Sequence, residues 1–361
     1  MPKTNERLFD MTHFLSIISI AVLGIVFASN QLQTWLIILA VLFLGVAVMT
    51  SVHHAEVIAK RVGPSLGALI LALSVTVIEV GLITALMMND TPSSAIVARD
   101  TVFAAVIIVT NGIVGVCLVL GGLRFRELGF HVQGASSLLT VLAALAGLTL
   151  VLPNYTTSTP GPTYSHGQLI FASVASLILY FTLVLSQTKT HKDYFEPQEQ
   201  LSDEQSDTPS IKAAWVSFIS LILSLGVVIG LAKALSPSIE TGLDFLGAPK
   251  AVVGIVIALL VLLPETWAAV AAARSNQLQT SLNLALGSGA ASIALTIPVV
   301  SVFSVMTDRP LTLGLDGKGI VFLVLTFMIG GLTLGTGRTT ILQGAVHLVL
   351  LSAYLVMAFI P

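Results

Sequence analysis

Long apolar runs alternate with short polar connections along almost the whole chain. A helix that crosses the hydrocarbon core of a bilayer needs about 20 predominantly apolar residues. Eleven runs approach or exceed this length, so the pattern predicts an all-α, polytopic membrane protein with about eleven transmembrane helices. The runs are residues 14–30, 33–52, 65–88, 98–122, 136–153, 167–187, 213–234, 248–272, 279–305, 318–336 and 340–360.

The polar segments between the runs show how the chain is divided. The longest of them, residues 189–212, is acidic and splits the chain near its middle. No small-residue cleavage site follows the first apolar run. We therefore interpret residues 1–32 as a retained N-terminal helix rather than as a removed signal peptide.

Composition supports the membrane interpretation. The chain has 361 residues, of which 55% are hydrophobic and 9% are charged, whereas a soluble domain carries about 25% charged residues. There is no basic stripe, so no nucleic-acid partner is expected, and membrane lipid is the expected surrounding. The single cysteine, Cys117, argues against a disulfide framework and against a thiolate metal site.

Lysine and arginine are unequally shared between the two sets of connections. With a cytoplasmic N-terminus, 11 of the 16 basic side chains fall in cytoplasmic segments and 5 on the opposite side. Cytoplasmic loops of membrane proteins carry an excess of basic residues. We therefore predict a cytoplasmic N-terminus and an external C-terminus.

Two glutamates lie midway along apolar runs that are long enough to span the bilayer. They are Glu79, in GALILALSVTVIEVGLITALMM, and Glu265, in AVVGIVIALLVLLPETWAAVAAA. A carboxylate at that depth is costly unless it is paired, hydrated or protonated, and such residues are functional candidates by default. Two glutamates in similar contexts predict one shared cation site.

The five runs from residue 33 onward match the five runs that follow the acidic segment. Glu79 falls in the second run of the first set, and Glu265 in the second run of the other. Because five is odd, the two sets enter the membrane in opposite orientations, as in the inverted repeats of many secondary transporters. The predicted parts are an N-terminal helix (1–32), a first five-helix repeat (33–188), an acidic cytoplasmic linker (189–212) and a second five-helix repeat (213–361).

A pair of facing glutamates can hold a cation or protons, but not both at once. Calcium prefers hard oxygen ligands, and a bound proton competes with a bound cation for the same carboxylates. Such a site is the minimal device for antiport by alternating access around Glu79 and Glu265. Supporting oxygens or helix breaks are expected from Thr76, Asn111, Pro264, Ser288 and Ser292, and an accessory acid at the cytoplasmic mouth from Glu56.

Other interpretations remain open at this point. A cation channel could use the glutamate pair as its filter, and its flux would then need no counter-ion gradient. The glutamates could also be protonated links between helices with a purely structural role. An enzyme is not expected, because the runs contain no HExxH, no paired aspartates and no serine–histidine set. No cofactor is expected, and the oligomeric state is left open, with a homo-oligomer among the alternatives.

Four segments carry a family pattern. They are HHAEVIAKRVGPSLGALILALSVTVIEVGLI, LVLSQTKTHKDYF, LLVLLPETWAAVAAARSNQLQTSLNLALGSGAASIALTIPVV and GTGRTTILQGAVHLVLLSAYL. Together they resemble the calcium/cation–proton exchanger family, specifically its bacterial ChaA-type branch, over roughly residues 50–360. The resemblance implies an N-terminal helix plus two inverted five-helix repeats, with Glu79 and Glu265 as the paired central glutamates. It also implies exchange of calcium, sodium or potassium for protons in the bacterial inner membrane.

The surroundings of both glutamates depart from the pattern of the wider family. Many members carry G-N-x-x-E, whereas here Thr76 and Leu262 stand three residues before the two glutamates. The amide oxygens are missing at both places, which matches the ChaA-type branch with its association with sodium and potassium. Because the oxygen ligands set cation selectivity, strict calcium selectivity is not expected.

Three further features have two interpretations each. The acidic residues of 193–207 form either a cation-sensing segment or a solvated linker. His53 and His54 are either proton-pathway groups or part of an interfacial turn. The lone His347 in the last run is expected to be a hydrogen-bonded interhelical donor rather than a metal ligand.

Overall fold

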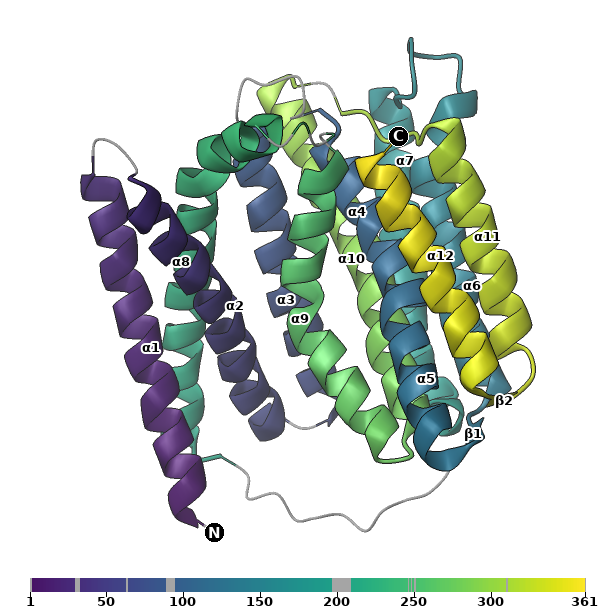
Figure 1. The fold of residues 1–361 in the computed structure, drawn as a ribbon, viewed down its shortest axis with the longest axis horizontal. Coiled ribbons are helices and arrows are strands. Elements are labelled where there is room, and N and C mark those ends of the chain that lie inside the picture. The colour runs from purple at the N-terminus through teal and green to yellow at the C-terminus, as the bar shows by residue number, and fades with distance from the viewer. Residues whose placement is uncertain are drawn as a thin grey trace. The chain divides into compact units, whose positions relative to one another are not determined.

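The computed structural model is built almost entirely of helices (Figure 1). It describes residues 2–29, 33–62, 64–88, 95–196, 209–245, 247, 249, 251–309 and 311–360, with side chains throughout except at 2–10, 64–73, 236, 239, 240, 243 and 244. The α-helices are α1 (Pro2–Ala28), α2 (Thr34–Val62), α3 (Pro64–Met87), α4 (Val97–Ile107), α5 (Val114–Phe125), α6 (Val132–Ala146), α7 (His166–Leu185), α8 (Ile211–Phe245), α9 (Ala251–Arg274), α10 (Leu278–Thr307), α11 (Gly317–Leu334) and α12 (Ile341–Phe359). The shorter elements are the π-helical segments η1 (Ile108–Ile113), η2 (Gly147–Val151) and η4 (Ser186–Thr190), the 3-10 segments η3 (Leu152–Tyr155) and η5 (Lys192–Tyr194), and the strands β1 (Leu128–Gly129) and β2 (Arg338–Thr339).

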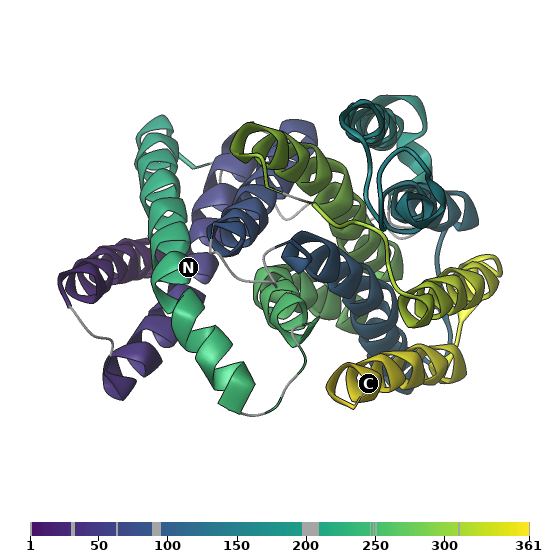
Figure 2. The same cartoon turned by 90° about the horizontal axis from the view of Figure 1, so that it is seen from above.

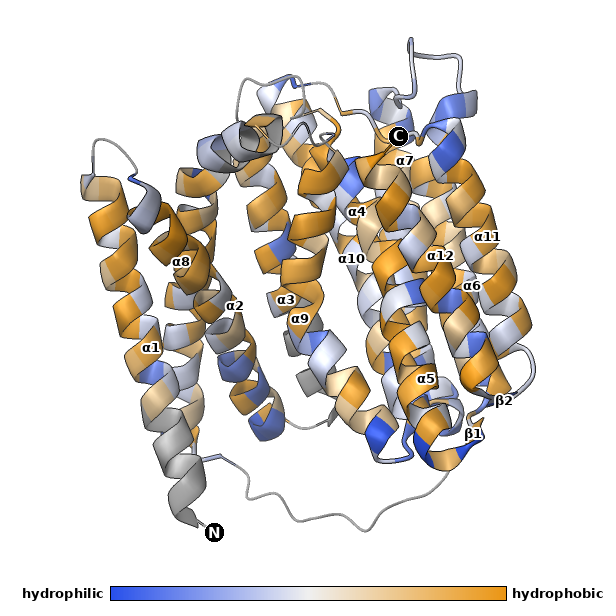
Figure 3. Cartoon of the chain, viewed as in Figure 1, coloured by the Kyte–Doolittle hydropathy of each residue, from blue (hydrophilic) through white to orange (hydrophobic). Residues whose placement is uncertain are grey.

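The helices confirm the prediction of a polytopic all-α membrane protein. Ten of the described helices are long and apolar enough to cross a bilayer, and Ser74–Met87 is a shorter apolar part of α3. With α3 they account for the eleven predicted spans, since α4, η1 and α5 form one continuous span. Figure 3 shows apolar residues along the helices and hydrophilic residues mostly toward the helix ends.

The chain forms two compact units that do not coincide with the predicted repeats. Met1–Asp90 and Glu204–Ala248 make up the first unit, and Thr91–Asp203 with Pro249–Pro361 make up the second. Each unit therefore takes helices from both halves of the chain. The division into repeats at 33–188 and 213–361 stays a prediction.

The first unit consists of α1, α2, α3 and α8. Helix α2 packs against α8 and α3, and α1 packs against both α2 and α8 (Figure 2). Two glycines allow close contact: an added Cβ at Gly81 of α3 would lie 2.5 Å from Ile229 of α8, and one at Gly230 would lie 2.8 Å from Leu23 of α1. Small residues at such crossings let membrane helices approach closely.

In the second unit, α10 is the central helix and contacts α4, α5, α6, α7 and α9. Helix α9 lies against α4, where an added Cβ at Gly254 would come within 2.6 Å of the carbonyl carbon of Asp100. Helix α12 lies against α5, where a Cβ at Gly344 would be 2.8 Å from the backbone nitrogen of Val119. The backbones of both helix pairs are thus in direct contact.

A short antiparallel ladder in the second unit was not predicted from the sequence. Leu128 of β1 pairs with Thr339 of β2, and Gly129 pairs with Arg338. Two residues per strand are too few to produce a detectable alternation of polar and apolar positions. The ladder brings the end of α5 next to the end of α11.

The ends of the second unit differ in the basic residues they carry. The β1–β2 ladder places Arg126 and Arg338 at the same end, and a bridge between Thr163 and Thr312 closes the other end, near Arg309. This separation agrees with the two sets of basic residues assigned from the sequence. Which end faces the cytoplasm stays a prediction.

Replacement of Gly254 by alanine is expected to destabilise the second unit. The new Cβ would lie 2.6 Å from the carbonyl carbon of Asp100 and 2.7 Å from the backbone nitrogen of Thr101, so α4 and α9 must move apart. Overpacking of this kind costs about 1–3 kcal/mol. Thermal unfolding in detergent should therefore show a lower midpoint than for the unchanged protein.

Gly331→Ala is the matched control. Gly331 lies in α11 with nothing within 4 Å of an added Cβ, and alanine is favoured over glycine in a helix interior by about 1 kcal/mol. Its unfolding midpoint should stay the same or rise. Equal midpoints for the two variants would show that the α4–α9 contact is not tight.

Candidate functional site

Glu79 lies in the middle of α3, in the first unit. Its side chain is 3% exposed, and Ser74 and Thr76 on the preceding turns are also buried. Two residues after Glu79, Gly81 faces Ile229 of α8. The helix that carries the carboxylate is therefore held closely against α8, and the predicted ligand Thr76 is buried on the same helix one turn before Glu79.

Glu265 lies on α9, in the second unit, and is 8% exposed. The preceding residue, Pro264, is buried inside the helix. Proline has no N–H, so the carbonyl of Leu260, four residues earlier, loses its helical donor. The carbonyl of Leu262 differs, because the hydroxyl of Thr266 donates to it at 2.6 Å. A carboxylate and a carbonyl without its helical donor are both hard oxygen ligands of the kind that calcium takes.

The span that contains Asn111 is π-helical around this residue. Between α4 and α5 the chain is π-helical over η1, and the N–H of Val114 bonds to the carbonyl of Val109 five residues earlier. Such π-helical turns occur frequently at functional sites. The segment packs against α9 and α10, and its Thr110 and Asn111 are 1% and 0% exposed.

The Asn111 amide is hydrogen-bonded at both ends within the second unit. Its Nδ2 donates to Thr326 Oγ1 of α11 at 2.8 Å, and its Oδ1 lies 3.0 Å from Nδ1 of His347 in α12. The other ring nitrogen of His347 lies 3.1 Å from Thr333 Oγ1. This confirms that His347 is a hydrogen-bonded interhelical residue. We refer to Asn111, Thr326, Thr333 and His347 as the amide network.

Thr326 and Thr333 were not among the site residues predicted from the sequence. They stand seven residues apart in an apolar run, so they lie on one face of α11 two turns apart. This spacing was the sequence indication of a shared role for the two threonines, but threonine also occurs in membrane helices without a hydrogen-bond partner on another helix.

The two serines predicted on α10 differ in burial. Ser292 is 4% exposed, whereas Ser288 is half-buried. Gly289 lies between them, and an added Cβ there would be 3.3 Å from Val109 of η1. This turn of α10 therefore lies against the π-helical segment.

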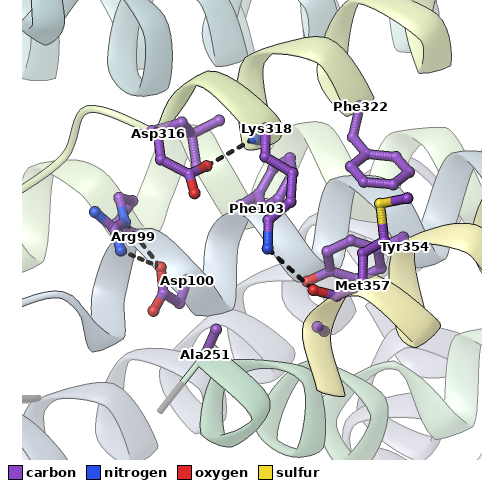
Figure 4. A pocket seen from close by; sticks show the side chains of 12 residues that line it. Arg99, Asp100, Phe103, Ala251, Asp316, Lys318, Phe322, Tyr354 and Met357 are labelled. Carbon is purple, nitrogen blue, oxygen red and sulfur yellow. Dashed lines mark hydrogen bonds and ion pairs between the residues drawn. The ribbon is translucent and has the colours of Figure 1, made fainter. Parts of the chain in front are cut away.

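A pocket of about 100 Å³ opens in the second unit between α4, α9, α11 and α12 (Figure 4). Nε and Nη2 of Arg99 both contact Oδ1 of Asp100, at 2.8 and 2.7 Å, and Nη1 donates to the carbonyl of Gly314 at 3.2 Å. Across the pocket, Lys318 Nζ donates to the carbonyl of Met357 at 3.0 Å. An adjacent Arg–Asp pair in the first turn of an apolar run was the sequence indication of this pocket.

Three aromatic rings line the same pocket. Tyr354 of α12 lies edge to face with Phe103 of α4 and with Phe322 of α11, at centroid separations of 5.5 and 5.8 Å. Thr326 follows Phe322 by one turn of α11, and His347 precedes Tyr354 by two turns of α12. The rings therefore lie between the charged pocket and the amide network along these two helices.

Histidines and hydroxyls of three helices meet in the first unit. Nδ1 of His13 in α1 lies 2.9 Å from Oγ of Ser220 in α8, and its ring centroid is 4.7 Å from that of His54 in α2. Ser16 Oγ lies 3.4 Å from Nε2 of His54 and 3.3 Å from Ser224 Oγ. These contacts link α1 to α2 and α8.

His53, His54 and Glu56 of α2 differ in how deeply they are buried. His54 is fully buried, His53 is half-buried and Glu56 is exposed. The adjacent histidines thus lie on different faces, as expected. Glu56, the expected accessory acid, lies at the surface of α2.

Residues 189–196 and 209–212 of the acidic segment are described. Phe195 is buried there, and its carbonyl accepts a hydrogen bond from Asn283 Nδ2 at 2.6 Å. Asp193 and Glu196 belong to this described part. The acidic residues Glu199, Asp203, Glu204 and Asp207 lie outside the described residues. The beginning of the segment is therefore anchored to α10.

Comparison with known proteins identifies the family. The sodium/calcium exchanger protein family matches residues 32–189 and 216–360, which is most of the chain. The chain belongs to this family. The resemblance to cation–proton exchangers seen in the sequence is thereby confirmed.

Two relatives of this exchanger-family chain cover almost its whole length. A protein of Sinorhizobium fredii whose name describes an ionic transporter, y4hA, is 47% identical over 315 residues, which is 87% of this chain and 86% of that protein. The sodium-potassium/proton antiporter ChaA of Escherichia coli K12 is 36% identical over 352 residues, which is 95% of each chain. The expected ChaA-type branch is thus supported by 36% identity over 95% of the chain.

Solved structures share the fold of this exchanger-family chain. Native YfkE has a TM-score of 0.73 at 16% identity and covers 97% of this chain and 100% of its own. The H+/Ca2+ exchanger CAX has a TM-score of 0.73 at 12% identity and covers 98% and 88%. The fold is therefore that of membrane cation exchangers.

Proposed function

We propose that this exchanger-family protein is a secondary active antiporter that exchanges calcium, sodium or potassium for protons by alternating access. Glu79 and Glu265 are proposed to bind the cation or the protons. The observation that carries the proposal is the burial of both carboxylates, at 3% and 8% exposure, midway along apolar helices. Relatives named as a sodium-potassium/proton antiporter and, at 26% identity over 325 residues, as a Ca(2+)/H(+) antiporter of Aphanothece halophytica support this substrate class.

Competition for the carboxylates couples the two fluxes. A cation attracts a carboxylate strongly in a low dielectric, and a proton on the same carboxylate removes that attraction. Binding of one species therefore requires release of the other. If the two glutamates serve one ion, their protons titrate as a coupled pair rather than singly.

Further oxygens are proposed from residues close to each glutamate. Thr76 is one turn from Glu79, and the carbonyl of Leu260 is left without a helical donor by Pro264. Ser292 and Ser288 are proposed as further donors on α10, with Asn111 in a supporting role. Glu56 is exposed, which suits an accessory acid that exchanges protons with solvent.

The membrane and the sidedness are inferred from separate observations. Bacterial relatives of nearly full length indicate the inner membrane. The excess of basic residues in one set of connections supports a cytoplasmic N-terminus.

The proposal is tested with purified protein in proteoliposomes that have an acidic interior and contain a pH-sensitive dye. Addition of calcium, sodium or potassium outside is expected to make the interior more alkaline only for the transported cations. The response should be absent in empty liposomes and in the Glu265→Gln variant.

The same preparation separates a carrier from a channel. A channel would admit the cation without a proton gradient and, with the membrane potential clamped, would move no protons. If wild-type proteoliposomes show no proton movement on addition of calcium, sodium or potassium, the proposed substrate class is wrong.

A further inference from the structure

The amide network includes Asn111, the only asparagine of the π-helical segment η1. Its four members are almost completely buried, with Asn111 at 0%, His347 and Thr326 at 1% and Thr333 at 4% exposure. The hydrogen bonds join η1 to α11 and α12 over separations of 215 and 236 residues in the chain. The network is therefore a tertiary contact rather than a local feature of one helix.

The chemistry of the donors fixes the protonation of one ring nitrogen. In this orientation of the amide, the Asn111 oxygen faces Nδ1 of His347 and can only accept, so Nδ1 carries the hydrogen that lies between them. The Asn111 nitrogen donates to Thr326, which is consistent with that orientation of the amide. On the other side of the ring, the Thr333 hydroxyl can donate to Nε2 or accept from it. Nδ1 is thus the nitrogen on which the Asn111 contact depends.

Helix α12 approaches η1 and α5 closely around His347. An added Cβ at Gly115 of α5 would lie 3.1 Å from Cβ of His347, and one at Gly112 would lie 3.3 Å from Leu351. Helix α12 is therefore seated directly on η1 and α5, with His347 in the contact. This close contact between the helices keeps His347 next to Asn111.

The segment that His347 holds needs support from outside. A π-helical turn is a rare form inserted into an α-helix, and such conformations persist where the surroundings fix them. Thr110, next to Asn111, has a buried hydroxyl without a hydrogen-bond partner among the described residues. In the described part of the chain, Asn111, and not Thr110, is therefore the polar side chain through which η1 is hydrogen-bonded to other helices.

The position of η1 matters for the proposed function because η1 packs against α9, the helix of Glu265. A change from π-helical to α-helical turns in η1 would rotate the following residues and alter the packing on α9. We propose that His347 is a positioning residue for transport: its Nδ1–H holds Asn111, and thereby η1, in the form that binds the cation tightly. This inference rests on the proposed function, and it assigns no ion contact to His347.

Two substitutions separate the roles of the ring nitrogens. In His347→Asn, the amide nitrogen is attached at the same carbon as Nδ1 and can still donate to Asn111. In His347→Gln, the amide nitrogen is one bond further out, near the place of Nε2, and can reach Thr333 but not Asn111. Both variants remove the ring, and loss of packing alone should affect the smaller asparagine more than glutamine.

Cation-dependent proton movement in proteoliposomes is the readout, with KM and kcat determined for each variant. We expect His347→Asn to keep a KM near that of the wild type. His347→Gln should raise KM about ten- to a hundredfold, since it leaves a buried amide oxygen unsatisfied. Thr333→Val, which removes the hydroxyl at Nε2 only, should change KM little.

A double variant tests whether His347 acts through Asn111. Asn111→Ala should raise KM as His347→Gln does, and the combination should be no worse than either change alone, because residues of one network are not additive. Equal KM values for His347→Asn and His347→Gln, or a Thr333→Val effect as large as that of His347→Gln, would overturn the inference. Size-exclusion profiles and unfolding midpoints of all variants identify any that fail to fold.

Failure of the positioning role of His347 can be distinguished from failure of the proposed function. If Glu265→Gln abolishes exchange but the two His347 variants behave alike, the positioning role is wrong and the antiporter assignment stands. If Glu265→Gln exchanges as the wild type does, the glutamate assignment is wrong. The split between the two His347 variants can be measured in either case.

Discussion

Exchange is expected to disappear when either Glu79 or Glu265 is replaced by glutamine. Glutamine has nearly the same size but no negative charge, so each substitution removes one of the two proposed charges and one proton-binding group. At a separation of about 4 Å and an effective dielectric of about 20, one charge contributes about 4 kcal/mol. This corresponds to about a thousandfold in cation affinity. Proton movement driven by each cation in proteoliposomes measures the loss.

Glu127→Gln is the matched control for these variants. Glu127 is exposed and lies 3.6 Å from Arg338 in a surface ion pair, a type of contact that contributes little. Its exchange rate and KM should equal those of the wild type. A folded Glu79→Gln or Glu265→Gln variant that exchanges as fast as Glu127→Gln would remove that glutamate from the proposed site.

The second large effect is expected from Arg99→Met, on stability. Asp100 has a side chain only 9% exposed, and its Oδ1 receives two guanidinium contacts from Arg99. Removal of the arginine leaves a nearly buried carboxylate without its counter-charge. Breaking a buried ion pair from one side costs about 3–5 kcal/mol, and the partial exposure of Arg99, at 18%, favours the lower end. Thermal unfolding in detergent should show a clearly lower midpoint.

The double variant Arg99→Met with Asp100→Asn gives the comparison that isolates the ion pair. Without either charge the desolvation cost also disappears, so the double variant should recover much of the lost stability. The hydrogen bond from Arg99 to the carbonyl of Gly314 is lost in both variants and cancels in this comparison. A double variant as unstable as Arg99→Met alone would show that the lost packing of the arginine, not the charge of Asp100, decides stability.

Much of the fold could be predicted because a bilayer imposes simple requirements on a chain. Each span must be long and apolar, and these properties are read from consecutive residues. Eleven helices of suitable length were therefore predicted, with boundaries within a few residues of most observed ones, such as 279–305 for α10 (Leu278–Thr307). The largest differences are at α1, α2 and α8. Helix α1 begins at Pro2, well before the apolar run that starts at residue 14, and α2 and α8 continue beyond their runs as far as Val62 and Phe245. A helix does not have to stop where its residues become polar.

The candidate site could be predicted only in part. Glu79 and Glu265 stand out in the sequence because an acidic residue in an apolar run is rare, and the structure shows both to be buried. Asn111 was identified from its place in a corresponding span, but its hydrogen-bond partners were not. A threonine in an apolar helix gives no indication of whether it bonds within its own helix or across to another.

The sequence by itself determined the membrane class, the number of spans, the two buried glutamates and the exchanger family. All of these depend on residue type and on local order along the chain. The tertiary structure alone decided the π-helical form of η1, the contacts of His347 with Asn111 and Thr333, and the Arg99–Asp100 pocket. Asn111 and His347 are 236 positions apart, and the direction of a hydrogen bond between them depends on how α12 packs against η1. No sequence pattern indicates how α12 packs against η1.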